Sequence, residues 1–78
     1  MLFRSPQSPE AWYDLAAMQA SLGKLDAAVQ NVGRSLILSD QRRRTNPGSK
    51  DLRVEVAKEE RFTPLRTRPD WSAATQPQ

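Results

Sequence analysis

The chain has 78 residues, of which 37% are apolar and 27% are charged, and this length is enough for one small domain. It has neither Cys nor His, and its net charge of +3 comes from residues 40–78, where nine cations face six anions. This composition excludes disulfides, thiolate metal sites and Cys or His catalysis, and no apolar run approaches the roughly 18 residues of a membrane span. We therefore expect a soluble, cytoplasmic interaction module that is not an enzyme and carries no cofactor.

The first predicted element is a helix that follows a flexible leader, residues 1–7. Ser8 is a favourable N-cap and Pro9 suits the first helical position. Apolar residues then recur at helical spacing as far as Leu22, and Gly23 is expected to end the helix.

A second helix is predicted from Leu25 to about Arg44. Gly33 lies inside it at a cost of roughly 1 kcal/mol relative to Ala, which indicates a close helix–helix approach. A basic cluster, Arg42-Arg43-Arg44, closes it, and cations are favourable at a helix C-terminus. Pro47 then forces the chain out of helical geometry.

The remaining residues predict a short third helix and a series of turns. This helix could start at Asn46-Pro47 or at Ser49-Lys50, and both starts remain open. Residues 51–60 favour helix over strand because an isolated strand would have no pairing partner. Beyond them, residues 61–71 are predicted to form turns and residues 72–78 a disordered tail.

Residues 9–42 resemble one tetratricopeptide repeat, a helix–turn–helix unit of about 34 residues. The motif positions are occupied by Trp12, Leu15, Ala16, Gly23, Ala28 and Val32. Three positions depart from the pattern, because Gln19 replaces Tyr, Val32 replaces the large aromatic residue and Asp40 replaces Pro. The resemblance implies an all-α fold: a repeat hairpin over residues 8–45 and a capping helix and turn segment over residues 46–71.

Residues 61–71 are similar to the phrase that closes many bacterial arrays of such repeats, which implies the terminal piece of an α-solenoid. A weaker likeness is to the repeats that end large bacterial multi-span membrane glycosyltransferase-like proteins. About three repeats are usually needed to bury the apolar stripe. A single repeat would therefore need upstream repeats, self-association or its own tail to bury its apolar stripe. Of these, we expect upstream repeats, which would make the chain a piece of a larger protein.

The resemblance also implies a function, which is the binding of a protein or peptide partner in a groove lined by the first helix. The residues expected to line this groove are Glu10, Tyr13, Asp14, Ala17 and Ser21. One alternative is electrostatic binding of nucleic acid or another anion by Arg42, Arg43 and Arg44, although no aromatic platform for base stacking accompanies them. The other is a structural cap of a larger membrane-anchored enzyme.

Two packing predictions complete the interpretation. The first is a buried cluster made by Trp12, Leu15, Ala28, Val29 and Val32. The second is a lid, in which Phe62, Leu65 and Trp71 turn back at the intervening prolines onto the second and third helices. The lid is expected to cover Ile37, Leu38, Leu52 and Val56.

Overall fold

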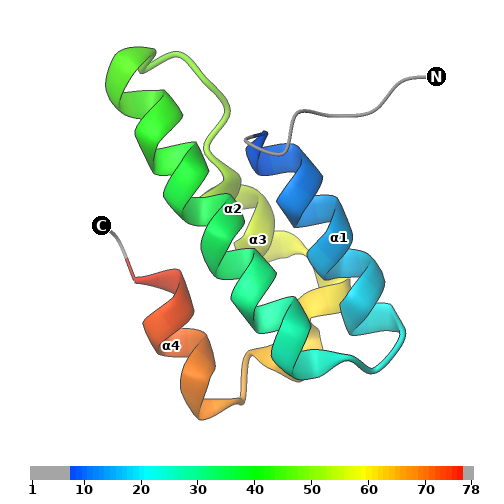
Figure 1. The fold of residues 1–78 in the computed structure, drawn as a ribbon. Coiled ribbons are helices and arrows are strands. Elements are labelled where there is room, and N and C mark those ends of the chain that lie inside the picture. The colour runs from blue at the N-terminus through cyan, green and yellow to red at the C-terminus, as the bar shows by residue number, and fades with distance from the viewer. Residues whose placement is uncertain (1–7, 77–78) are drawn as a thin grey trace, which may run out of the picture.

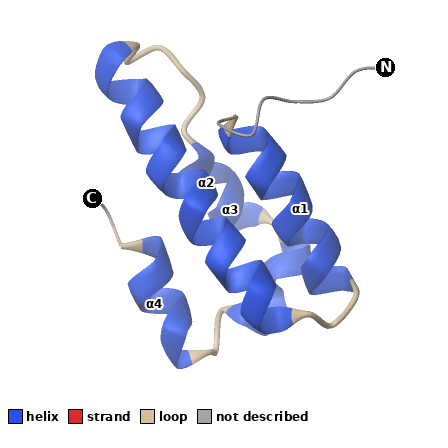
Figure 2. Cartoon of the chain, viewed as in Figure 1, coloured by secondary structure: helices blue, strands red, loops and turns tan. Residues whose placement is uncertain are grey.

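The computed structural model describes residues 8–76, and all regular structure within them is helical, which confirms the predicted all-α fold (Figure 1, Figure 2). The two long helices form an antiparallel hairpin, the third helix and a 3₁₀ helix lie behind it, and the last helix runs beside the second (Figure 1). The predicted leader and the end of the predicted tail, residues 77–78, lie outside the described residues. The elements are α1 Pro9–Ser21, α2 Leu25–Thr45, α3 Leu52–Lys58, the 3₁₀ helix η1 Glu60–Leu65 and α4 Pro69–Thr75.

The hairpin follows the local signals of the sequence closely. Pro9 occupies the first turn of α1, and Gly23 has a φ of 82°, a left-handed conformation that reverses the chain toward α2. Ser8 stands at the N-cap position, but its hydroxyl does not cap the backbone as expected, because it donates to Glu10 Oε1 at 3.2 Å. Proline and glycine geometry therefore define this hairpin more than side-chain capping does.

Small side chains allow the two helices to approach closely. Alanine makes up the fully buried face of α1, where Ala16 and Ala17 are inaccessible to solvent. On α2, Ala28 and Val32 are equally buried, as predicted. Because alanines present little apolar area, the hairpin alone forms a thin core.

Two residues of the predicted buried cluster lie elsewhere. Leu15 is 37% exposed and Trp12 is only half-buried, whereas Ala28, Val29 and Val32 are buried. The prediction was wrong for Trp12 and Leu15 because η1 covers the face of α1 that carries Ala17, and this face lies away from those two side chains.

The third helix begins at neither of the two expected positions. The Asp51 carboxylate accepts a hydrogen bond from the backbone N–H of Arg53 at 3.0 Å, and this cap starts α3 at Leu52. The buried hydroxyl of Ser39 accepts from the N–H of Leu52 at 3.2 Å, so α2 also fixes this end. The preference for helix over strand in this segment was correct.

The C-terminal segment is more ordered than expected. Pro69 starts α4, and the expectation of a disordered tail was wrong for residues 72–75, which form the last turn of this helix. A Cβ placed on Gly33 would lie 3.6 Å from the Cβ of Ala74, so the predicted close approach at Gly33 is made by α4. Because Gly33 has no side chain and Ala74 has a small one, α4 can dock closely on α2.

The predicted lid exists, but it covers a different part of the hairpin. Phe62 and Leu65 are fully buried, and the Trp71 ring lies 6.1 Å from that of Phe62. Leu52 and Val56 are buried as expected, whereas Ile37 remains 38% exposed and Leu38 is only partly covered. The loop after α2 returns the chain to the alanine face of the hairpin, which leaves the Ile37 and Leu38 side open.

Candidate functional site

The predicted partner groove on α1 is closed by the chain itself. Ala17 is completely buried, and Tyr13 is half-buried, with its ring edge-on to Phe62 at 5.5 Å between centroids. The Tyr13 hydroxyl donates to Glu59 Oε1 at 2.9 Å. The expectation that Tyr13 and Ala17 line an open groove was therefore wrong, because η1 and its preceding residue occupy that face.

The contact between Tyr13 and Glu59 is a structural link. Burial, supported by the hydrogen bond to the Glu59 carboxylate, raises the pKa of Tyr13 well above its ordinary value. The pKa of Glu59 falls to about 2, chiefly because Arg61 donates hydrogen bonds to its carboxylate and in spite of partial desolvation; Tyr13 adds a smaller lowering. Tyr13 stays protonated as a donor and ties α1 to the start of η1.

The other three predicted groove residues do not form one surface. Glu10 makes a two-pronged ion pair with Arg42, with oxygen–nitrogen distances of 2.6 and 3.0 Å. The Arg42 hydrogen bonds lower the pKa of Glu10 to about 2 against a weaker opposing effect of burial. Asp14 and Ser21 are exposed on α1. The five predicted residues are thus divided between a covered face, an ion pair and open surface.

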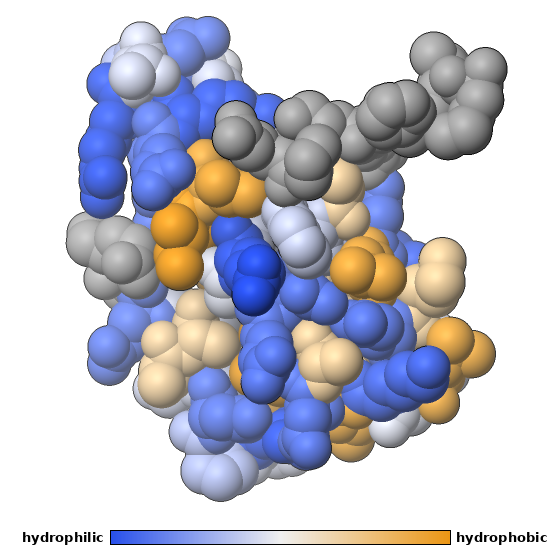
Figure 3. Space-filling view, viewed as in Figure 1, coloured by the Kyte–Doolittle hydropathy of each residue, from blue (hydrophilic) through white to orange (hydrophobic). Residues whose placement is uncertain are grey.

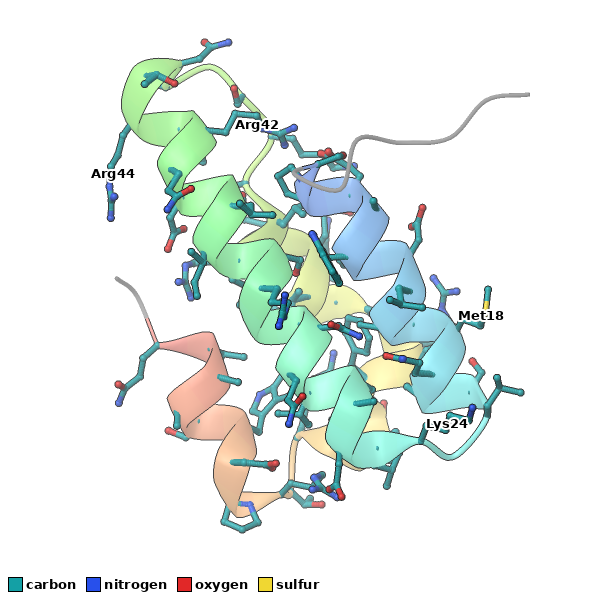
Figure 4. The ribbon with its side chains drawn as sticks, in the orientation of Figure 1. Met18, Lys24, Arg42 and Arg44 are labelled. Atoms are coloured by element: carbon teal, nitrogen blue, oxygen red, sulfur yellow. The ribbon has the colours of Figure 1, made fainter. Side chains whose placement is uncertain are left out.

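The basic cluster is also divided. Arg42 points toward the start of α1, where it holds Glu10, and Arg44 points away from α1 (Figure 4). Arg43 donates to the carbonyl oxygen of Ser49 in the loop after α2. Two of the three guanidinium groups therefore bind acceptors of the chain, and Arg44 is the exposed member of the cluster.

The face of the hairpin opposite α3 is open, and polar bridges cross it between the helices. The Arg34 guanidinium lies 5.1 Å above the centroid of the Trp12 ring, a cation–π contact. Farther along, Asn31 Nδ2 donates to Gln19 Oε1 at 2.8 Å. We call this surface the open face, and it consists of Pro9, Trp12, Gln19, Asn31, Arg34, Leu38, Gln41 and Arg42.

Apolar and hydrophilic groups alternate across this view of the molecule, with apolar groups over the upper part of α2 and along α1 (Figure 3). At the upper end of the open face, Pro9, Leu38, Gln41 and Arg42 line a shallow hollow between the start of α1 and the second half of α2. Arg42 Nε is buried there and has no hydrogen-bond partner among residues 8–76. An unsatisfied buried donor costs on the order of 1–3 kcal/mol, so a ligand that shifts the Arg42 side chain and brings an acceptor to Nε would be favoured.

Sequence reasoning missed Leu38, Gln41 and Arg34 as site residues. Their signal is the spacing of residues 31, 34, 38 and 41, which places them along one face of α2. This spacing could be found in the sequence, but the interpretation required knowing which face the C-terminal segment covers.

A second hollow, of about 370 Å³, lies between α2, α3 and α4 beside Trp71 and Arg53. Two arginines line it, and both are engaged. Arg66 donates to the carbonyl oxygens of Val56, Ala57 and Glu59. Arg53 donates to both oxygens of Asp40 at 2.6 and 3.1 Å and to the carbonyl oxygens of Thr75 and Gln76. This hydrogen bonding joins three helices and leaves Arg53 no donor pair for a ligand. The hollow is therefore part of the packing between these helices and is not a candidate binding site.

Residues 8–76 contain no cluster of three or more acidic side chains placed to hold a metal ion. Within the same range, no helix combines the length and apolar character needed to cross a membrane.

Comparison with protein-family models, with curated proteins and with solved structures finds no match to this chain. The surfaces described above are therefore the observations that bear on its function. Among them, the open face combines half-buried apolar groups with an unsatisfied donor.

Proposed function

We propose that the chain is a protein–protein interaction module, the terminal piece of an array of tetratricopeptide-type hairpins, and that its partner docks on the open face. The C-terminal segment already covers the opposite face of the hairpin, where Phe62 and Leu65 are buried against it. A hairpin that is closed on one side only offers its other side for stacking or binding.

The observation that carries this proposal is the environment of Arg42 at the upper end of the open face. Its Nε is buried and unpaired within the described residues, while its two Nη atoms hold Glu10. Pro9 and Leu38 form apolar walls beside it. A partner that inserts an apolar side chain between the walls and shifts the Arg42 side chain far enough to give Nε an acceptor would satisfy both groups at once.

The remainder of the face suits a protein partner better than a nucleic acid. The half-buried ring of Trp12 is covered by Arg34, and the pair presents an amphipathic surface of the kind enriched in protein interfaces. A nucleic acid would require free cations, but Arg42 and Arg43 are bound to acceptors of the chain.

The proposal is tested with peptides selected from a random display library against the wild-type chain. Leu38→Glu puts a charge in the open face, and Val54→Glu puts the same charge on an exposed apolar residue of α3. We expect selected peptides to lose at least tenfold in affinity toward Leu38→Glu and to bind Val54→Glu normally. Peptides that bind both variants equally well, or a selection that yields no binder, would contradict the open face as the docking surface.

A binding assay with labelled oligonucleotides distinguishes nucleic-acid binding from binding of a protein partner. Binding through exposed cations should vanish as the salt concentration rises to physiological values. Sequence-dependent retardation that persists in salt would favour nucleic acid over a protein partner.

A further inference from the structure

The outer side of α1 carries an apolar stripe that none of the described elements covers. It consists of Ala11, Leu15 and Met18 of α1 and of Leu22, the C-cap residue that directly follows the helix. Leu15, Met18 and Leu22 are 37%, 59% and 65% exposed, respectively. Helical geometry of 100° per residue directs this stripe away from the buried alanines of α1. The labelled Met18 projects outward from α1 on the side away from α2 (Figure 4).

The spacing of the stripe is that of a helix-pairing seam. Steps of four, three and four residues separate its members, the a/d pattern of helices that pack in register. Three of the five large apolar side chains that are exposed within residues 8–76 belong to it, whereas the other two, Ile37 and Val54, lie on different helices. Apolar groups are thus concentrated on one narrow edge of the molecule.

We infer that this stripe binds the same stripe of a second copy of the chain, with the two α1 helices antiparallel. A two-fold pairing centred between Leu15 and Met18 brings Met18 of one copy level with Leu15 of the other. It also places Leu22 level with Ala11 of the second copy, so that a large side chain faces a small one. A parallel pairing would instead set Leu22 against Leu22 and Ala11 against Ala11, which leaves a gap at one end.

Charge favours the same orientation. Of the two acidic residues of α1, Glu10 is paired with Arg42, whereas Asp14 is exposed in the first half of the helix. Lys24 follows the C-terminal end of α1 (Figure 4). The antiparallel pair brings Lys24 of each copy toward the half of the other α1 that carries Asp14, and it also opposes the two helix dipoles. A parallel pair would place like charges side by side.

The proposed contact between the two α1 helices is short, so the dimer should be weak. The 13 residues of α1 span roughly 20 Å, and only three large side chains of each copy contribute to it. Such a contact lies at the small end of specific interfaces, so we expect a reversible dimer with a dissociation constant in or above the micromolar range, on the order of 10–1000 μM.

Sedimentation equilibrium of the full chain over increasing concentrations tests the dimer. Met18→Glu introduces a charge into the stripe at an exposed position, so folding should be unaffected, and Val54→Glu is the matched control outside it. We expect the dissociation constant to rise at least tenfold in Met18→Glu and to stay the same in Val54→Glu. A wild-type chain that remains monomeric at millimolar concentration, or equal association of both variants, would overturn the inference.

The absence of cysteine from the sequence allows the orientation to be tested by cross-linking. In the antiparallel pair, a mixture of Ala11→Cys and Leu22→Cys chains should form the mixed disulfide. Leu22→Cys alone should not form its own, because the two sites would lie about 16 Å apart along the helix axis. Preferential formation of the Leu22→Cys homodimer would overturn the antiparallel arrangement.

The stripe and the open face are separate surfaces, so their tests fail independently. Leu38→Glu should dimerise like the wild type even where it loses peptide ligands. If it also loses dimerisation, the dimer involves the open face, and the stripe is not its contact.

Discussion

Apart from Pro9, the buried residues of α1 are alanines, so large side chains from distant parts of the sequence supply the bulk of the core. Phe62 is the largest fully buried side chain, and it contacts Tyr13 on one side and Trp71 on the other. A single aromatic ring thereby connects α1, η1 and α4. Replacing one such residue should therefore affect the whole fold more than replacing a residue of the apolar stripe.

We expect Phe62→Ala to lower the free energy of unfolding by about 3–5 kcal/mol, because it leaves a cavity between three helices. Leu15→Ala, at a position 37% exposed, should change it by no more than about 1 kcal/mol. Urea denaturation followed by circular dichroism measures both. Equal losses in the two variants would mean that Leu15 belongs to the core after all.

The second prediction about individual residues concerns the loss of folding stability at acidic pH. The pKa of Glu59 is about 2 in the folded chain and 4.5 as an ordinary value, so the folded state holds fewer protons. Its contribution to stability is fully present above about pH 4.5 and disappears as the pH falls toward 2. Glu59→Gln should lower stability at pH 7 by about 1–2 kcal/mol and flatten the fall in stability over this pH range.

Thermal melts between pH 2 and pH 7 test the effect of Glu59, with Glu60→Gln as the exposed neighbouring control. Glu10, whose pKa is also about 2, should still give both variants part of the acid dependence. Identical pH profiles for Glu59→Gln and Glu60→Gln would exclude a special role for the carboxylate that Tyr13 and Arg61 share.

At the scale of elements, α4 packs on α2 without burying a side chain of its own completely. It docks through half-buried Trp71 and Ala74, the latter against Gly33 of α2. Arg53 from α3 holds its C-terminal end by donating to the carbonyl oxygens of Thr75 and Gln76. The space at Gly33 therefore controls whether α4 stays on the hairpin.

A pair of substitutions at Gly33 tests this control. A Cβ there would meet Ala74 at ordinary contact distances of 3.5–3.8 Å, so Gly33→Ala should fit. It should stabilise the chain by about 0.5–1 kcal/mol because Ala favours the helix. Gly33→Leu should displace α4 while α1 and α2 remain helical.

Hydrogen exchange of residues 69–75 measures the release of α4, with residues 25–36 as the internal reference. We expect faster exchange in α4 and little change in α2 for Gly33→Leu. Loss of protection in both helices at once would show that α4 and the hairpin unfold as one unit.

For the whole molecule, the sequence correctly predicted the boundaries of the two hairpin helices, which depend on neighbouring residues. It did not predict which face of α1 is buried, because burial there depends on contacts with a distant segment. Pro9, Gly23 and the apolar spacing define the two hairpin helices within a residue or two, because capping and helix propensity are local. The faces of α1 were assigned incorrectly: Trp12 was expected inside and Tyr13 in an open groove. Both assignments depend on where residues 59–71 dock, and no local pattern states this.

The C-terminal segment was predicted in outline for a similar reason. Pro69 correctly indicated a change of direction, since it starts α4, whereas the turn expected at Pro64 was wrong because this residue lies inside η1. Phe62 and Leu65 were correctly expected to be buried. The last turn of α4 was missed because its order depends on Ala74 meeting Gly33, a contact between residues 41 positions apart. The spacing of α2 indicated only that Gly33 would have a close neighbour.

The link between Tyr13 and Glu59 spans 46 residues, and this separation has a consequence for the order of folding. The contacts between α1 and α2 close short loops, whereas the aromatic lid can form only after a much longer loop has closed, at a higher entropic cost. We expect the hairpin to assemble early and the lid to close last. Under mild denaturant the lid should open first, so the alanine face of the hairpin should be the first buried surface to meet water.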